Sequence, residues 1–403
     1  MATLPYFAQL DNPDKPVDDD TLQSSLLDAM HAALKEIGAG VNKGYGMQGG
    51  GIYVGLSGIA LVELRIAEVL SRTGIKSRYE DMTPELMETQ ARKTCDLAVK
   101  LCAQGHESQA SLQHRAGHAS EAQQAAKAVE GYLSDVRRMH SSECEVLYGR
   151  AGYLYALLYL RHHLGTSAVN ATSVRDVVEQ IIEEGKRVAN SQPELQKFGL
   201  MYEWHGKCYL GAAHGLVGIL HTLLLCYEDV VAVCGGEAQA SALLMQAVNA
   251  LLEERFPSGN LKSSLGSDKD RLVQWCHGAP GLLLLLAKVQ EVLLKGQPDP
   301  AITQAAKKAG EEVWKRGLLK KGVGLCHGIS GNGYSLLALY RMTHDPLHLR
   351  QAQHFGQVAA LRYIELLEVP DRGLSLYEGL AGAAGYWTDL LDPLAARFPG
   401  FDL

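Results

Sequence analysis

The sequence has few cysteines, no block of basic residues and no apolar run long enough to cross a bilayer. Its eight cysteines are spread thinly over 403 residues, unlike the dense disulfide framework of a small secreted protein. Lys and Arg number 38 against 45 Asp and Glu, so the net charge is −7, and no basic cluster predicts nucleic-acid binding. The most apolar run begins at Leu282 and reaches Lys288 too soon to span a membrane. We therefore expect no nucleic-acid partner and no transmembrane segment.

The N-terminal segment also lacks targeting signals. It begins Met1-Ala2-Thr3-Leu4-Pro5, without the basic region and apolar core of a signal peptide and without the glycine that N-myristoylation requires. The expected location is the reducing environment of the cytoplasm. Residues 1–20 are rich in Pro and Asp and are expected to form an extended arm. A helix is predicted from about Thr21, with Asp20 as its cap.

What the sequence does contain is a repeated turn, a Gly-x-x-Gly string followed by an apolar segment with helical period. Six copies are explicit. A seventh, degraded copy, in which His replaces the first Gly, lies at His114-Arg115-Ala116-Gly117. The intervening segments, such as 177–188 and 301–313, are amphipathic and charged, which predicts outer helices around apolar inner ones. The six explicit copies begin at Gly55, Gly149, Gly215, Gly278, Gly328 and Gly379.

No segment alternates with a period of two residues, so the chain is predicted to be all-α. Its length allows two or three domains, but single closed architectures also reach this size, and one domain over residues 1–403 is predicted. The repeats could build an open solenoid or a closed ring. A solenoid needs atypical polar repeats at both ends, whereas the copy at Gly379 is complete. We therefore predict closure, with the first and last repeats in contact and the turns gathered at one end. The glycines alone indicate architecture, because helix packing explains every copy.

Two of the turns carry adjacent Cys and His residues. Trp275-Cys276-His277-Gly278 returns as Leu325-Cys326-His327-Gly328, each followed by a second Gly three places after the first. Cys276, Cys326 and His327 would supply three ligands and leave a fourth position open, which is typical of a catalytic zinc. His277 could replace His327 as the ligand. The alternative is a pair of structural cysteines in a reduced core. A Cys followed directly by His within a repeated turn favours the metal site.

Other turns carry further polar and aromatic residues. His214 precedes a predicted helix at a place taken as equivalent to that of Cys276 and Cys326, and a histidine there can serve as acid or base near neutral pH. Residues that flank the turns could contact a substrate, although polar contacts at helix ends explain them equally well, and the tryptophan among them is expected to form a cavity wall. These candidate substrate contacts are Glu145, Arg150, Tyr202 and Trp275.

These motifs resemble those of the LanC family, and most of all the eukaryotic LanC-like proteins of animals. The resemblance covers the chain from about Gly51 to its end. It implies a seven-fold (α/α)7 toroid with zinc at one mouth. Bacterial members add peptide Cys thiols to dehydroalanine or dehydrobutyrine, and eukaryotic members resemble glutathione transferases that add glutathione to such residues in proteins. The strings that carry it include Gly211–Gly215, Trp275–Gly281, Gly324–Gly328, Val146–Arg150, Leu200–Trp204, Arg255–Asn260 and Ala396–Pro399.

By motif, Cys276, Cys326 and His327 match the family's zinc ligands and His214 matches its acid/base histidine. The chemistry fits these assignments. Zinc coordination removes the proton from a thiol that is mostly protonated at neutral pH. The thiolate then attacks the β-carbon of the dehydroamino acid, and His214 can protonate the α-carbon. The implied activity is zinc-dependent addition of glutathione to dehydroalanine or dehydrobutyrine in peptides or proteins.

The resemblance also implies glutathione contacts. Lys321 and Asp371 match two of them, whereas Glu368 stands where animal relatives carry Arg. Glutathione affinity is therefore expected to be weaker than in those relatives. A different class of function is a zinc- and glutathione-binding scaffold without turnover, because a retained site can bind and not catalyse. Kinases or other signalling proteins are kept as candidate partners.

Overall fold

The computed structural model describes residues 5–7, 18–44, 51–101 and 119–403. Over these ranges the chain forms helices and no β-strand, and strand-like pairing is limited to isolated bridges. The prediction of an all-α protein is confirmed. The chain divides into two compact units, one of Met1–His118 with Val313–Asp402 and the other of Ala119–Glu312 with Leu403.

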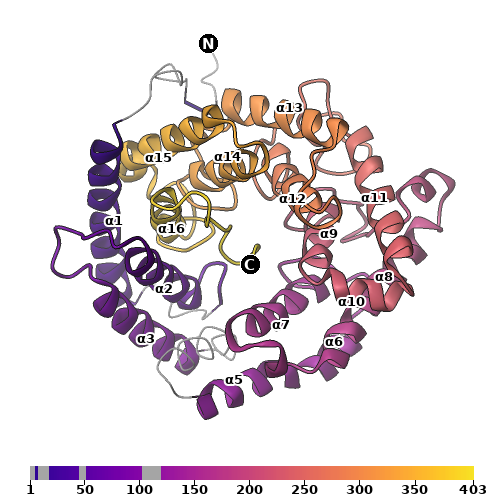
Figure 1. Ribbon diagram of the computed structural model, residues 1–403, viewed down its shortest axis with the longest axis horizontal. Coiled ribbons are helices and arrows are strands. Elements are labelled where there is room, and N and C mark those ends of the chain that lie inside the picture. Colours follow the sequence, from indigo (N-terminus) through magenta and orange to yellow (C-terminus); the bar gives the residue numbers. More distant parts are fainter. Residues whose placement is uncertain (1–4, 8–17, 45–50, 102–118) are drawn as a thin grey trace. The chain divides into compact units, whose positions relative to one another are not determined.

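In the first unit, α2 packs against α3, α14 against α15, and α1 against α16 (Figure 1). Helices α14 and α16 are buried on nearly all sides, whereas α1 buries one face that includes Leu22, Leu26 and Met30. The helices are α1 (Asp19–Asn42), α2 (Leu56–Thr73), α3 (Pro84–Leu101), α14 (Ile329–Thr343), α15 (Pro346–Leu366) and α16 (Leu380–Leu390).

The cap of α1 differs from the sequence prediction. The helix starts two residues earlier than expected, and Asp18, not Asp20, accepts a hydrogen bond at 3.0 Å from the backbone N–H of Thr21. Asp20 lies inside the first turn, where a carboxylate is favoured by the helix dipole and cannot cap. Before it, the described residues 5–7 pair with residues 318–320, through Phe7 N–H to Leu318 O and Lys320 N–H to Pro5 O. Residues 1–4 and 8–17 of the predicted arm lie outside the described residues, and its last two residues belong to α1.

In the second unit, α9 packs against α7 and α12, and α10 packs against α8 and α11. Helix α9 is buried on every side over Leu216–Leu224, whereas α8 buries one apolar face. The elements are α5 (Ala119–Gly131), α6 (Leu133–Arg138), α7 (Arg150–Leu164), η2 (Thr166–Ala168), α8 (Ala171–Ala189), η3 (Pro193–Phe198), α9 (Leu216–Leu225), α10 (Tyr227–Cys234), α11 (Glu237–Glu253) and α12 (Ala279–Val292). Helix α13 (Pro300–Arg316) crosses the boundary between the units, and it buries Ile302, Ala305, Ala306 and Ala309 on one face.

All six explicit Gly-x-x-Gly turns start a helix, and in each the first glycine is the N-cap. The second glycine lies in the first turn, where a Cβ atom would collide with the carbonyl oxygen of the residue six places earlier. Only glycine allows this approach, so the repeated motif has a steric cause. The predicted copy at His114–Gly117 lies outside the described residues. The colliding pairs are Gly58 with Ile52, Gly152 with Val146, Gly218 with Ala212, Gly281 with Trp275, Gly331 with Leu325 and Gly382 with Leu376.

The first and last described turns touch within the first unit. Tyr377 N–H donates to Tyr53 O at 3.1 Å, and the two phenol rings stack with centroids 4.5 Å apart. Between α2 and α16, Arg65 Nε donates to the fully buried carboxylate of Asp389 at 2.8 Å. The predicted contact between the first and last repeats is therefore observed, as closure requires and an open solenoid does not.

No single helix in the described ranges is long and apolar enough to cross a membrane. Helices α9 and α10 reach that length and composition only as a pair, and they meet at an angle of 95°.

Candidate metal and acid–base site

Cys276 lies in a tight turn that a buried asparagine shapes. Gln274 and His277 exchange backbone hydrogen bonds across the turn, and the Gln274 side-chain amide donates to Cys276 Sγ at 3.0 Å. Asn260 is fully buried; its Oδ1 accepts from Ala279 N–H at the start of α12, and its Nδ2 donates to Leu272 O before the turn. The thiol is therefore held by a turn that is fixed at both ends.

Cys326 and His327 end the loop before α14 in the first unit. Cys326 is 4% exposed, and its backbone N–H donates to Tyr377 O at 2.7 Å. His327 is half-buried, and one of its ring nitrogens lies within 4.8 Å of Cys326 Sγ. The loop before α14 therefore presents a thiol and an imidazole side by side.

Cys276 of the second unit and Cys326 and His327 of the first unit are the Cys and His side chains of the described residues that could hold a metal ion. Two thiols and one imidazole fit zinc, which prefers sulfur and nitrogen ligands, and three protein ligands leave a position for an exchangeable group. The described cysteines form no disulfide.

Backbone hydrogen bonds set the register between neighbouring turns and correct one sequence-based assignment. Ala213 N–H donates to Cys276 O at 3.5 Å, just as Cys326 N–H donates to Tyr377 O. Ala213, and not His214, therefore corresponds to the cysteines, because each lies two residues before its N-cap glycine. His214 corresponds to the histidine that follows each cysteine. The equivalence expected from the sequence was wrong by one residue, but it is the turn of His214 that lies beside the turn of Cys276.

His214 is paired with a buried carboxylate that its sequence position did not predict. Glu145 is 1% exposed, and its Oε2 lies 2.8 Å from His214 Nδ1. The same carboxylate accepts from the backbone N–H groups of Leu147 and Tyr148, so the turn before α7 fixes its position. An ionised Glu145 requires a proton on Nδ1, which leaves Nε2 of His214 as the nitrogen that can hold or release a proton. The two residues are 69 positions apart, and no local motif links them.

An aromatic stack covers one face of the His214 ring. The Trp204 ring lies parallel to the imidazole, with centroids 4.2 Å apart and planes inclined by 7°. Tyr148 is nearly parallel to both rings and is 68% exposed. Tyr209 contacts the rings of both His214 and His277. The stacking holds the imidazole ring in the orientation in which its Nδ1 atom bonds to Glu145.

Three predicted substrate contacts are engaged inside the protein. Arg150 is 4% exposed and donates to the carbonyl oxygens of Met139, His140 and Glu143, which holds the loop before α7. Tyr202 is buried and donates to Ile181 O at 3.0 Å, and burial raises the pKa of its phenol well above the usual range. Trp275 is fully buried. These contacts match the simpler interpretation of polar and core contacts.

The predicted glutathione contacts lie on neighbouring loops of the first unit. Lys321 is half-buried, and a Cβ atom on the next residue, Gly322, would lie 3.4 Å from Pro370 Cγ. Asp371 follows that proline and is exposed, as is Glu368 beyond the end of α15. The loop of Lys321 therefore packs on the loop of Asp371, although the two residues are 50 positions apart.

Comparison with known proteins adds to this geometry. The family model described as "Lanthionine synthetase C-like protein" matches residues 46–403. The chain belongs to this family. Among curated members, "Glutathione S-transferase LANCL1" of Danio rerio is 38% identical over 259 residues, which are 64% of this chain and 62% of that protein. "LanC-like protein GCL1" of Arabidopsis thaliana is 39% identical over 267 residues, 64% of this chain and 58% of that protein. The matched region thus spans less than two thirds of either relative.

A solved structure supports the fold. Nisin cyclase aligns with a TM-score of 0.63 at 17% identity, over 89% of this chain and 93% of its own. The chain therefore has the fold of this lanthionine synthetase C-like group, an α/α toroid, and the fold class predicted from the sequence is confirmed. A single domain over residues 1–403, a cytoplasmic location and signalling partners stay predictions.

Proposed function

We propose that this member of the lanthionine synthetase C-like family adds the thiol of glutathione to dehydroalanine or dehydrobutyrine residues of peptides or proteins, with zinc as its cofactor. The observation that carries the proposal is the backbone bond between Ala213 and Cys276. It puts the turn of a carboxylate-paired histidine against the turn of a candidate zinc ligand. The name of the zebrafish relative, a glutathione S-transferase, is consistent with this chemistry.

The proposed zinc ligands are Cys276, Cys326 and His327, whose two thiols and one imidazole fit that ion. Zinc held there would supply a Lewis acid that lowers the pKa of a bound thiol.

The residues of the chain account for the proton transfer. Addition of a thiolate to the β-carbon of a dehydroamino acid places negative charge on the substrate carbonyl, and the α-carbon must then gain a proton. His214 holds that proton on Nε2, while Glu145 keeps Nδ1 occupied and fixes the plane of the ring. Trp204, stacked on the imidazole, excludes water from one face of the ring. Sulfur gains a carbon bond, the double bond is consumed and one proton moves from thiol to α-carbon, so the reaction needs no oxidant.

Glutathione carries two carboxylates and one amine. Lys321 offers an ammonium to one carboxylate from the same loop as Cys326, and Asp371 offers a carboxylate to the amine from the neighbouring loop. Glu368 adds a negative charge to that neighbouring loop and weakens binding of an anionic ligand.

Turnover of a peptide that contains dehydroalanine, with glutathione as thiol, tests the activity by intact mass. We expect His214→Ala to retain zinc and fold and to lose about 10²–10⁴-fold in rate, because a general acid is typically worth that much. His162→Ala, which changes an exposed histidine at the end of α7, is the matched control and should keep full turnover. Wild-type turnover in His214→Ala would reduce His214 to a packing residue. Binding of zinc and glutathione without product would instead favour the scaffold function.

Zinc content tests the ligand set separately. Purified protein should carry one zinc per chain, and Cys326→Ala should lose it, since structural and catalytic zinc sites depend on each thiolate. Cys226→Ala, which removes a buried thiol at the C-terminal end of α9, is the control. Undiminished zinc in Cys326→Ala would refute the assignment.

Calorimetry with glutathione tests the subsite on the first unit. Lys321→Ala should weaken binding, and losing a charged contact costs roughly 1.5–3 kcal/mol. Lys320→Ala removes the same charge one residue earlier, where the ammonium lies over the ring of Phe7, and should leave the affinity unchanged. Equal affinities in all three proteins would mean that glutathione binds elsewhere or that the nucleophile is a protein cysteine.

A further inference from the structure

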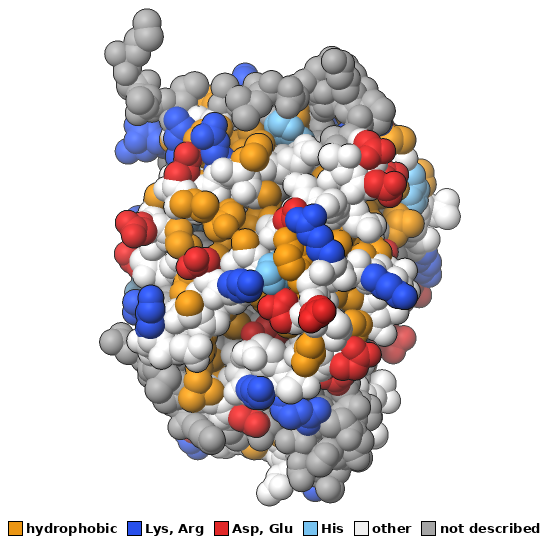
Figure 2. Space-filling view, turned by 90° about the vertical axis from the view of Figure 1, so that its left-hand side faces the viewer, with side chains coloured by type: hydrophobic (Ala, Val, Ile, Leu, Met, Phe, Trp, Pro, Cys, Tyr) orange, Lys and Arg blue, Asp and Glu red, His pale blue; other side chains and the backbone are white. Residues whose placement is uncertain are grey.

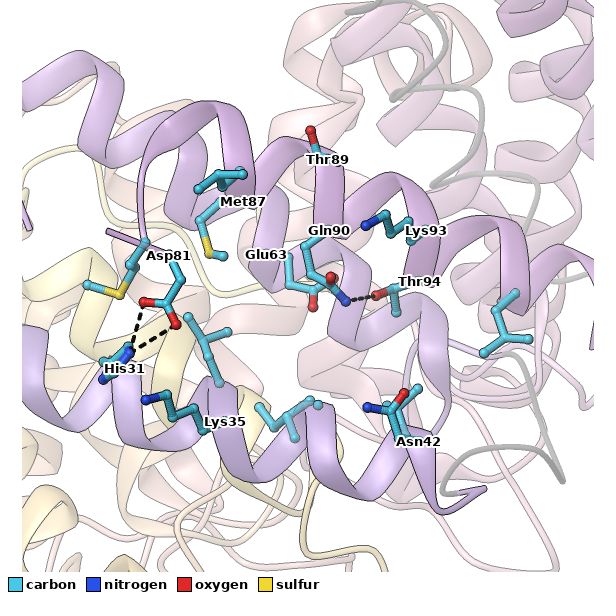
Figure 3. A pocket seen from close by; sticks show the side chains of 17 residues that line it. His31, Lys35, Asn42, Glu63, Asp81, Met87, Thr89, Gln90, Lys93 and Thr94 are labelled. Atoms are coloured by element: carbon cyan, nitrogen blue, oxygen red, sulfur yellow. Dashed lines mark hydrogen bonds and ion pairs between the residues drawn. The ribbon is translucent and has the colours of Figure 1, made fainter. Parts of the chain in front are cut away.

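A separate cavity of about 590 Å³ lies between α1 and α3 in the first unit, with α2 behind it (Figure 3). Sites of this size accommodate small molecules or single side chains. Helices α1 and α3 each pack on inner helices and leave a gap between them. Apolar side chains cover much of its wall, among them Leu34, Ile37, Val41, Met87 and Leu97.

One acidic side chain enters this cavity from the rear. Glu63 of α2 is 4% exposed, and in Figure 3 its carboxyl group points into the space between α1 and α3. Its Oε2 atom is buried and has no hydrogen-bond partner among the described residues. The neutral side chains of Thr94 and Gln90 interact with the carboxyl group, and burial raises its pKa to about 7. A buried carboxyl group that lacks hydrogen-bond partners lowers the stability of the fold unless a bound ligand supplies them.

The other charged groups around the cavity do not neutralise Glu63. Asp81 is paired with His31, whose Nε2 lies 3.0 Å from Oδ1. Lys35 of α1 and Lys93 of α3 are exposed side chains at the mouth. On the face shown in Figure 2, basic and acidic side chains are interspersed with hydrophobic ones. A polycation would meet two lysines here, so the cavity favours a ligand with one positive charge.

We propose that this cavity binds an organic cation, namely an aliphatic ammonium or guanidinium group that pairs with Glu63 while its carbon chain lies against the apolar wall. The cavity offers a partner to each part of such a ligand: the buried Glu63 carboxyl group to the cation, and apolar side chains to the carbon chain. A metal ion is a poorer fit, because Glu63 is the one buried acidic side chain among the lining residues. The proposal is independent of thiol addition, since none of the candidate zinc or glutathione residues lines the cavity.

Calorimetry with n-pentylammonium at about pH 8, where Glu63 is ionised, is the first test. The wild-type protein should show saturable binding, and Glu63→Gln should weaken it at least about tenfold, because a charged contact is lost. Glu36→Gln changes an exposed residue of α1 that does not line the cavity and should bind as the wild type does. The uncharged analogue 1-pentanol should not bind measurably.

A second variant tests the cavity without touching the carboxyl group. Gly38 lines the cavity, and a Cβ atom placed on it meets nothing within 4 Å. Gly38→Leu should therefore keep the fold, fill part of the space and weaken n-pentylammonium binding. Equal binding by wild type, Glu63→Gln and Gly38→Leu would overturn the proposal, as would equal binding of pentanol or no saturable binding at all.

Capped lysine and capped arginine, with both backbone ends blocked, separate the two sources of such a cation. If they bind as tightly as n-pentylammonium and depend on Glu63 in the same way, the site takes a basic side chain of a partner protein. If the blocked backbone excludes them while n-pentylammonium binds, the site takes a free small amine. Either result supports a cation site, whereas binding of none of the three rejects it.

Discussion

Replacing Glu63 by Gln should change how the stability of the fold depends on pH. In the folded protein burial raises the pKa of Glu63 from 4.5 to about 7, so the folded state keeps a proton that the unfolded chain releases. Stability therefore falls as the pH rises from 4.5 towards 7 and stays lower above 7. The difference between about 7 and 4.5 is 2.5, which corresponds to ~3 kcal/mol at ~1.36 kcal/mol per pKa unit.

The amide side chain of the Glu63→Gln protein cannot ionise, so residue 63 does not lower the stability of this variant as the pH rises. Its free energy of unfolding, measured in urea relative to the wild type, should rise by ~3 kcal/mol between about pH 4 and about pH 8. All other titratable groups are shared by the two proteins, so their contributions cancel in the difference. Glu36→Gln, at an exposed site on α1, should show no such trend. A difference between Glu63→Gln and wild type that is constant with pH would refute the burial of an uncompensated carboxyl group.

Three further predictions concern the Gly-x-x-Gly turns, the pair of Glu145 and His214, and the loop of Glu368. Gly331→Ala should lower the free energy of unfolding by about 1–3 kcal/mol, because its Cβ would collide with a backbone carbonyl. Gly38→Ala, also within a helix but facing open space, should raise it by up to ~1 kcal/mol; two changes of the same sign in urea unfolding would contradict the steric argument. Glu145→Gln should lower kcat for thiol addition at least about tenfold with KM and zinc unchanged, because Glu145 orients His214. Glu368→Arg should tighten glutathione binding measured by calorimetry, and an unchanged affinity would place the ligand away from that loop.

Much of the architecture could be read from the sequence because its causes are local. A Gly-x-x-Gly string followed by a helix-period apolar segment predicts a helix start, since the second glycine is needed wherever a carbonyl passes close to the first turn. Cysteine directly followed by histidine in two equivalent turns predicts Cys276, Cys326 and His327 as metal ligands, and the zinc content of Cys326→Ala tests that prediction. The cap of α1 was misplaced by two residues, because Asp18, Asp19 and Asp20 offer three similar caps and only the backbone path selects one.

The partners of the candidate catalytic residues could not be read in this way. Glu145 and His214 are 69 residues apart, and nothing near either one marks the pair. Arg150 and Tyr202 looked like substrate contacts from their positions beside turns, but their hydrogen bonds are directed at backbone carbonyls inside the protein. A polar residue at a helix end has the same sequence appearance whether it faces a substrate or holds a loop.

The sequence by itself determined the helical class and the repeated turns, because each depends on residue type and spacing within one turn. Only the tertiary structure decided which neighbour each turn bonds, that Glu145 fixes His214, and that Glu63 is buried facing a cavity. These depend on how helices from distant parts of the chain pack together. Packing turns an ordinary glutamate on an amphipathic helix into a buried acid with a raised pKa, and no local pattern records that outcome.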